Sequence, residues 1–246
     1  MVWAFFEAVD LVGQTLWQAI KPPYRFKDVI QQLYFVAVGS APIVIFSVAF
    51  AAIVTIIEAS FHMKLVIKND ALVPGFAALL ILRELGPVVT ALLLTSRVGA
   101  GIASEVGTMK VTEQIDALKM LGIHPIKFIV VPRFLACLIG GVLLTSLSNG
   151  ICLFSAVMVS KMKLGYTTGY FLSGMRVFVE FQDFLFALVK GFFFGGIIPL
   201  MSCFYGFRCR SGAEGVGRAT TKSVVSSSVA IIIVDFILSW VFSYLY

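Results

Sequence analysis

Charge is scarce in this sequence. Asp, Glu, Lys and Arg make up only 13% of its 246 residues, against roughly 25% in a typical soluble domain. Hydrophobic residues make up 59%, and the mean hydropathy is +0.99. A soluble globular domain is therefore excluded. The composition is that of an integral membrane protein, whose helices are buried in lipid or against each other.

Clustered metal ligands and catalytic motifs are also missing. The four cysteines (Cys137, Cys152, Cys203 and Cys209) form no C-x-x-C pair, and the chain has only two histidines. We interpret the cysteines as reduced apolar residues and expect no metal site. The sequence contains no nucleophile elbow and no paired carboxylates on a soluble surface. We therefore expect no catalytic residues and no enzyme activity of the chain's own.

One stretch resembles a nucleotide-binding loop but lacks its chemistry. Residues 212–219 read GAEGVGRA, close to the P-loop pattern G-x-x-x-x-G-K-[ST]. Arg218 stands where that loop has its phosphate-binding lysine, and Ala219 stands where it has its magnesium-binding hydroxyl. We expect no cofactor to bind here and interpret the segment as a flexible loop that leads into the last apolar stretch.

Five apolar stretches are long enough to cross a bilayer, which requires roughly 20 residues per helix. They are residues 29–57, 71–104, 128–160, 184–207 and 223–246. The sequence thus predicts an all-α membrane protein with five transmembrane helices in a single domain, residues 1–246.

The basic residues predict its orientation. The net charge of +6 is spread between the apolar runs rather than gathered in a patch, so we expect no nucleic-acid partner. The chain start and the 97–133 and 208–222 segments hold 12 Lys and Arg, whereas 58–70 and 161–183 hold five. The positive-inside rule then places the N-terminus in the cytoplasm and the C-terminus outside.

Residues 1–28 are predicted to form an amphipathic helix and a linker. Glu7, Asp10, Gln14 and Gln18 follow one another at spacings of three or four, which gives a single narrow polar face. The stretch lacks the basic start and the cleavage site of a signal peptide. A helix lying in the membrane interface fits this pattern. Packing against the other spans is the alternative.

A short polar segment interrupts the apolar pattern between the second and third spans. Residues 108–122 predict a helix that Thr108 caps and that Gly122 ends in a left-handed conformation, with Pro125 preventing continuation. An apolar stripe is predicted along one face: Val111, Ile115, Leu118 and Leu121. The helix is either tucked under the bundle or presented to a soluble partner as a docking element.

Four charged residues fall inside the apolar spans: Arg83, Glu84, Lys190 and Asp235. Each costs about 2.5–3.5 kcal/mol on insertion scales. They either form neutralised structural pairs or face a water-filled lipid cavity. Counting depth along the spans, we expect Glu84 to be the partner of Lys190, with Asp235 as the second choice. Arg83 and Glu84 diverge by about 100° on a helix, so they should meet different partners.

Residues 83–136, RELGPVVTALLLTSRVGAGIASEVGTMKVTEQIDALKMLGIHPIKFIVVPRFLA, carry a family resemblance. This block closely resembles the MlaE/YrbE permease family of Mce-linked ABC transporters. The sequence GRATTKSVV, followed by a span that contains Asp235, is similar to the same family near the C-terminus.

The resemblance implies a permease subunit in a bacterial inner membrane that moves phospholipids. It implies a homodimer with two cytoplasmic ABC ATPases, which would bind the ATP and magnesium. Further partners would be an Mce-domain (MlaD-like) protein outside and, in many systems, a small STAS-domain protein inside. Residues 108–122 would then be the coupling helix that engages the ATPase, with these coupling residues: Lys110, Thr112, Glu113, Gln114, Asp116, Lys119, Gly122 and Pro125.

Two other classes of protein stay open. A secondary transporter or channel would need a pore of its own and usually internal repeats, of which we find none. A membrane scaffold that transports nothing is the other alternative.

Overall fold

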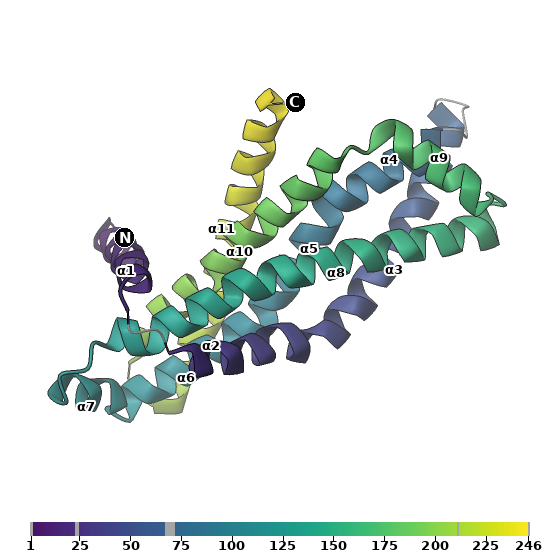
Figure 1. The fold of residues 1–246 in the computed structure, drawn as a ribbon. Coiled ribbons are helices and arrows are strands. Elements are labelled where there is room, and N and C mark those ends of the chain that lie inside the picture. Colours follow the sequence, from purple (N-terminus) through teal and green to yellow (C-terminus); the bar gives the residue numbers. More distant parts are fainter. Residues whose placement is uncertain (1, 23–24, 67–71, 211, 246) are drawn as a thin grey trace.

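The computed structural model describes residues 2–22, 25–66, 72–210 and 212–245. These residues form helices and no strand (Figure 1). Five helical segments among them are long and apolar enough to span a membrane: Phe26–Met63, Val73–Val111, Ile126–Lys163, Phe181–Phe207 and Gly212–Tyr244. The predicted all-α class with five spans is confirmed. The predicted span ends at residues 71 and 246 lie outside the described residues.

Several spans consist of α-helices joined by short π-helical turns. The first contains α2 (Phe26–Leu33), η1 (Tyr34–Val38) and α3 (Gly39–Val66). The second contains α4 (Val73–Leu80), η3 (Ile81–Leu85), α5 (Gly86–Leu94), η4 (Thr95–Gly99) and α6 (Ala100–Val111). The third contains η5 (Ile126–Val130) and α8 (Val131–Lys163), and the last two are α10 (Phe181–Phe207) and α11 (Gly212–Leu245). Outside the spans lie α1 (Val2–Ile20), α7 (Gln114–Met120) and α9 (Thr168–Phe178).

Helix α8 runs through the middle of the bundle, and its most extensive contact is with α10, beside it in Figure 1. Glycines make this approach possible. A Cβ added to Gly141 would lie 2.6 Å from the Gly191 carbonyl oxygen, and one added to Gly195 would lie 2.4 Å from that of Cys137. Small residues at such a crossing bring two backbones into contact. The third and fourth spans are therefore held in a fixed register.

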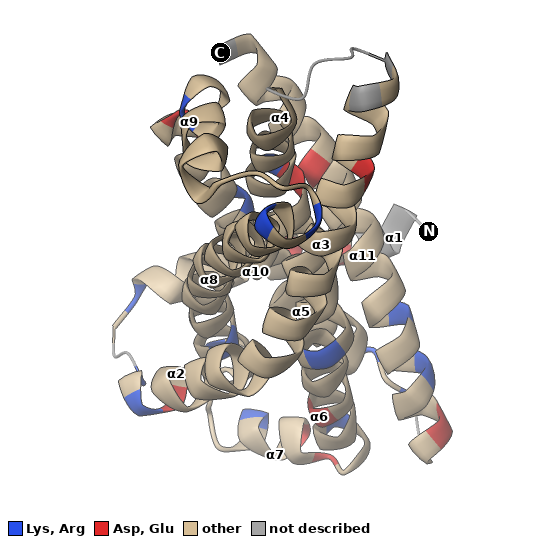
Figure 2. Cartoon of the chain, turned by 90° about the vertical axis from the view of Figure 1, so that its right-hand side faces the viewer, with Lys and Arg blue, Asp and Glu red and all other residues tan. Residues whose placement is uncertain are grey.

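The bundle has two distinct ends. Helix α7 lies at one end and α9 at the other (Figure 1), and we call these the α7 end and the α9 end. Most positions along the helices are uncharged residues, with Lys, Arg, Asp and Glu at scattered positions (Figure 2). Helix α9 was not predicted from the sequence. Thr167 caps its start by accepting a hydrogen bond from the Tyr170 N–H, and the helix buries Phe171.

The predicted 108–122 helix is divided in the structure. Helix α6 continues the second span to Val111, and α7 begins only at Gln114. Between them Glu113 has φ of 60°, a left-handed conformation that the sequence did not signal because the residue is not glycine. Gly122 has φ of 73°, as predicted for the end of the helix. Leu121, predicted to widen the apolar stripe, is instead 74% exposed.

The linker before the fifth span is much shorter than predicted. Helix α11 begins at Gly212, so the stretch GAEGVGRA is helical and was wrongly interpreted as a flexible loop. The pair between Glu214 and Arg218, one turn apart, supports this first part of the helix. Arg97, counted above with the basic residues of the 97–133 segment, lies within the second span, where it donates to the Ser40 hydroxyl over 2.6 Å.

Candidate functional site

Charged side chains from three spans meet near the α9 end of the bundle. Arg83 and Glu84 come from η3, Asp183 and Lys190 from α10, and Asp235 from α11. The structure thus brings together the four intramembrane charges predicted from the sequence and adds a fifth, Asp183. We call these five residues the charged cluster.

Lys190 is the centre of the charged cluster. Its side chain is 0% exposed, and its Nζ donates to Glu84 Oε2 over 2.9 Å. The same Nζ lies 2.7 Å from Asp235 Oδ1. The predicted contact with Glu84 is present, and the second-choice partner is in contact as well. Two carboxylates thus surround one buried ammonium, which offsets part of the cost of its desolvation.

Arg83 points to a different partner, as its position beside Glu84 predicted. Its Nε donates to Asp183 Oδ1 over 2.6 Å, and Asp183 is fully buried. The other oxygen of Asp183 accepts from the Glu180 N–H over 2.9 Å, within a capping box at the start of α10. Asp183 therefore ties the first turn of the fourth span to the second span.

Asp183 was not predicted as an intramembrane charge, because the sequence placed it in the external segment 161–183. A signal was available. Glu180 precedes Asp183 by three residues at the start of a long apolar run, and carboxylates at this spacing are typical of a helix N-terminus. With the span starting at Phe181, Asp183 enters the membrane beside Arg83.

A small cavity of about 160 Å³ opens beside the charged cluster. Arg83 and Glu84 line it with Ser239, whose hydroxyl donates to Glu84 Oε1 over 3.1 Å. Phe186 and Phe242 form the apolar part, with their rings stacked 4.0 Å apart. The cavity therefore offers charged and hydroxyl groups next to an aromatic wall, a combination suited to an amphiphilic molecule.

The charged cluster has an excess of one carboxylate. With all groups ionised, its two cations and three anions carry a formal charge of −1. In the part of the chain that the structure describes, no three His, Cys, Asp or Glu side chains are grouped as metal ligands would be.

The predicted coupling residues lie at the opposite end, around α7. Asp116 bonds Lys110 Nζ over 2.9 Å and Lys119 Nζ over 3.1 Å. Hydrogen bonds from Lys110 and then Lys119 hold the pKa of Asp116 below its ordinary value. Because Lys110 belongs to α6, these bonds fix α7 against the second span, and Ile115 is buried beneath it.

The tip of this segment is apolar rather than charged. Met120 is 89% exposed and Leu121 is 74% exposed. Among the other predicted coupling residues, Thr112 and Glu113 are exposed in the turn before α7, and Gln114 is exposed at its first position. Gly122 and Pro125 line a groove of about 550 Å³ between α7 and α1. The groups presented outward thus combine polar side chains with two large apolar ones.

Known membrane proteins are similar to this chain over most of its length. The family described as permease MlaE matches residues 29–241. A probable ABC transporter permease protein of Rickettsia typhi is 36% identical over 220 residues, which are 89% of this chain and 85% of that protein. The intermembrane phospholipid transport system permease protein MlaE of Haemophilus influenzae is 32% identical over 240 residues, 96% of this chain and 92% of that protein.

A plant protein is similar along nearly the whole chain as well. The chloroplastic protein TRIGALACTOSYLDIACYLGLYCEROL 1 of Arabidopsis thaliana is 30% identical over 238 residues, 97% of this chain and 68% of that protein. These similarities cover all five apolar spans and both ends of the bundle. The chain is a multi-pass membrane protein and belongs to the MlaE permease family.

Proposed function

We propose that this chain is the permease subunit of an ABC transporter that moves phospholipids between a bacterial inner membrane and an Mce-domain partner. Two copies of the chain form the membrane part, and two cytoplasmic ATPases bind the ATP and magnesium. A STAS-domain subunit on the cytoplasmic side is compatible with this arrangement. The N-terminus lies inside and the C-terminus outside, so the α7 end faces the cytoplasm.

The cavity beside the charged cluster is the observation that carries the proposal. A phospholipid has a charged headgroup joined to apolar chains, and the cavity places Arg83 next to the stacked rings of Phe186 and Phe242. The Arg83 guanidinium carbon lies 5.0 Å from the centre of the Phe242 ring. A guanidinium held this way binds a phosphate oxygen through planar N–H groups. Lys190 is fully buried, and its ion pair with Glu84 holds one wall of the cavity in place.

A homodimer is supported by the fifth span. Helix α11 is covered less by the rest of the chain than any other span. Its exposed face carries large apolar side chains: Val225, Val229, Ile232, Phe236 and Trp240. A second copy packed along α11 would enclose the cavity of each protomer, since Ser239 and Phe242 of α11 line it.

We assign the contact with the ATPase to α7. Ile115 and the bonds of Asp116 fix this helix to the bundle, whereas its C-terminal end exposes Met120 and Leu121. A rigidly held helix with an apolar end fits a groove on a soluble partner, as helix-in-groove recognition requires. Motion of that partner would pass into α6, and through it into the second span that carries Arg83 and Glu84.

The test is a reconstituted assay with the partner ATPase. The two proteins are co-expressed and placed in proteoliposomes that contain a fluorescent phospholipid, and ATP turnover and lipid transfer are measured together. We expect ATP-dependent transfer, reduced at least tenfold by Arg83→Gln and unchanged by Arg176→Gln, which removes an exposed arginine in α9. Transfer without the ATPase would indicate a secondary transporter or channel. A bound ATPase with no lipid transfer would indicate a scaffold.

A further inference from the structure

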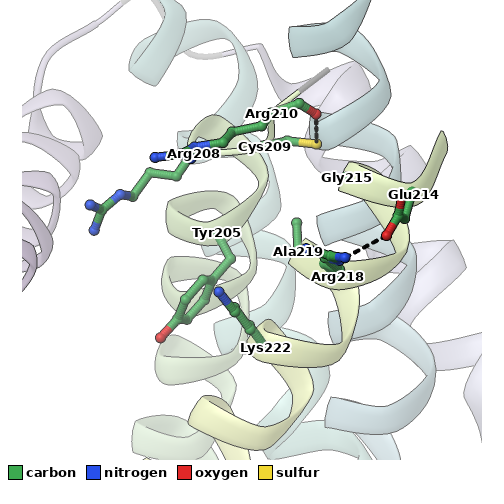
Figure 3. A pocket seen from close by; sticks show the side chains of 9 residues that line it. All are labelled: Tyr205, Arg208, Cys209, Arg210, Glu214, Gly215, Arg218, Ala219 and Lys222. Atoms are coloured by element: carbon green, nitrogen blue, oxygen red, sulfur yellow. Dashed lines mark hydrogen bonds and ion pairs between the residues drawn. The ribbon is translucent and has the colours of Figure 1, made fainter. Parts of the chain in front are cut away.

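A second polar cavity lies at the α7 end, far along the bundle from the charged cluster. It has a volume of about 570 Å³ and lies between the end of α10 and the start of α11 (Figure 3). Four basic side chains and one carboxylate line it: Arg208, Arg210, Arg218, Lys222 and Glu214. We call it the basic cavity. Nothing in the proposed transport path uses it.

The backbone around the basic cavity is held in place. A Cβ on Gly215 would lie 2.1 Å from the Arg210 carbonyl oxygen, so the absence of a side chain lets the linker rest directly on α11. The buried thiol of Cys209 also donates to that carbonyl, over 3.2 Å. Gly212 turns the chain with φ of 88°. The arginines of the linker are therefore attached to a fixed backbone.

The positive charges of the basic cavity are only partly compensated. Glu214 pairs with Arg218 on the same helix, and Glu7 of α1 lies 3.6 Å from Arg208. Within the described residues, Arg210 and Lys222 have no carboxylate within ion-pair distance. Four cations with two carboxylates leave a local excess of +2, and like charges gathered around one cavity repel one another unless an anion is present.

Helix α1 indicates how deep in the membrane the basic cavity lies. The helix exposes Phe6, Val9 and Trp17 and reaches the cavity through the ion pair of Glu7 with Arg208. Large apolar side chains left exposed on an amphipathic helix are expected at the boundary of headgroups and acyl chains. On α11, Lys222 is the last cation before the apolar part of the span. The basic cavity thus lies at the level of the lipid headgroups.

We propose that the basic cavity binds the phosphate-bearing headgroup of an anionic phospholipid in the leaflet at the α7 end, separately from the charged cluster. Arginine donors match the oxygens of a phosphodiester, and basic pockets between membrane helices are suited to anionic headgroups. The bound lipid supplies the missing negative charge and joins α1, α10 and α11. An acidic surface of a protein partner is a less favoured occupant, because α7 and not this cavity presents the protruding segment.

The test measures lipid retention by the purified full-length chain. Native mass spectrometry follows binding from nanodiscs that contain phosphatidylglycerol or only phosphatidylcholine. We expect Arg210→Ser with Lys222→Ser to weaken phosphatidylglycerol retention about tenfold or more. The matched control, Lys161→Ser with Lys163→Ser, removes two exposed cations at the α9 end and should leave it unchanged. The charge-preserving exchange Arg210→Lys with Lys222→Arg should retain most of the binding.

Several results would overturn the proposal. One is equal retention of phosphatidylglycerol by the wild type and the Arg210/Lys222 double variant. Another is retention of phosphatidylcholine as strong as that of phosphatidylglycerol. Displacement of the lipid by millimolar inorganic phosphate would assign the basic cavity to a free anion. Loss of ATPase association by the double variant, with lipid retention intact, would assign it to a protein contact. Thermal unfolding of each variant in detergent checks that the fold is preserved.

Discussion

The ammonium of Lys190 donates a hydrogen bond to the main-chain carbonyl of Arg83 over 2.9 Å, from the fourth span to the second. In an α-helix that carbonyl would receive the N–H of residue 87, but residue 87 is a proline and has no N–H. Pro87 therefore leaves this carbonyl without its usual α-helical donor, and the buried ammonium of Lys190 donates to it instead. This hydrogen bond satisfies both a main-chain carbonyl of the second span and the ammonium of the fourth span inside the membrane.

The first prediction concerns the role of Lys190 in stability. Lys190→Met removes the only cation in contact with Glu84 and Asp235 among the described residues, and leaves both carboxylates without it. Removing one partner of a buried ion pair typically costs about 3–5 kcal/mol. We expect a loss of this size in the free energy of unfolding, measured by denaturation in mixed micelles.

Two further variants make the result specific to the charge. Lys163→Met, at the exposed end of α8, should change the free energy of unfolding by less than about 0.5 kcal/mol. Adding Glu84→Gln and Asp235→Asn to Lys190→Met should recover part of the loss, because fewer charges then stay buried without a partner. Equal stabilities of Lys190→Met and Lys163→Met would contradict the assignment.

A second prediction uses an exchange of charges. If only Glu84 paired with Lys190, the exchange Glu84→Lys with Lys190→Glu would restore the interaction. Asp235 also lies within 2.7 Å of the ammonium, so this exchange brings two carboxylates together. We expect recovery of lipid transfer only when Asp235→Asn is added. Full recovery by the double exchange alone would mean that Asp235 makes no contribution.

Much of the fold follows from the sequence because long apolar runs leave few alternatives to spanning helices. Counting residues from the ends of those runs also predicted that Glu84, Lys190 and Asp235 lie at similar depth in the membrane and near one another. Asp183 was missed because its depth depends on where α10 begins, and its capping box with Glu180 sets that point. A shift of three residues at a helix start decides whether a carboxylate lies outside the membrane or inside it.

The segments between the spans were predicted less well. The turn at Glu113 has a left-handed conformation without glycine, so residue types gave no sign of the break between α6 and α7. The glycines near Arg218 suggested a loop. Gly215 instead lies inside α11, where its lack of a side chain allows close contact with the linker. Neither the left-handed turn at Glu113 nor the close contact of Gly215 with the Arg210 carbonyl has a local residue pattern that signals it.

The third prediction tests the crossing of α8 and α10. Gly141→Ala would place a methyl group 2.6 Å from the Gly191 carbonyl oxygen, so the two backbones must separate. Overpacking of this kind typically costs about 1–3 kcal/mol. Gly150→Ala, on the same helix, meets nothing within 4 Å and should be neutral or slightly stabilising. Thermal unfolding in detergent compares the two, and equal effects would show that the crossing tolerates a side chain.

The fourth prediction is a pH dependence of α7. Lys110 and Lys119 hold the pKa of Asp116 below its ordinary value of 3.8. A lowered folded-state pKa gives stability that is complete above the unfolded-state pKa and is lost as pH falls through the folded one. We expect α7 to stay docked on α6 at pH 4 and to loosen only below it.

A spin label at the exposed Ala117 position reports the mobility of α7. The label should become mobile in acid in the wild-type background and should already be mobile at neutral pH in Asp116→Asn. An identical acid transition in both proteins would assign the pH dependence to another group.

The last prediction concerns the contact that α7 offers to an ATPase. Met120 and Leu121 are exposed, so Met120→Glu with Leu121→Glu should leave insertion and unfolding nearly unchanged. If the apolar tip enters a groove, two buried carboxylates there should weaken ATPase association about a hundredfold, and lipid transfer should fall with it. Met162→Glu changes a methionine that is 71% exposed at the α9 end; it is the matched control and should keep both ATPase association and lipid transfer. Glu113→Lys distinguishes a charged contact from an apolar one. A partner that binds the charge of Glu113 loses affinity for this variant, whereas a partner that contacts only Met120 and Leu121 does not. Co-purification of the ATPase with each variant decides between them, and wild-type association of the Met120/Leu121 variant would remove α7 from the interface.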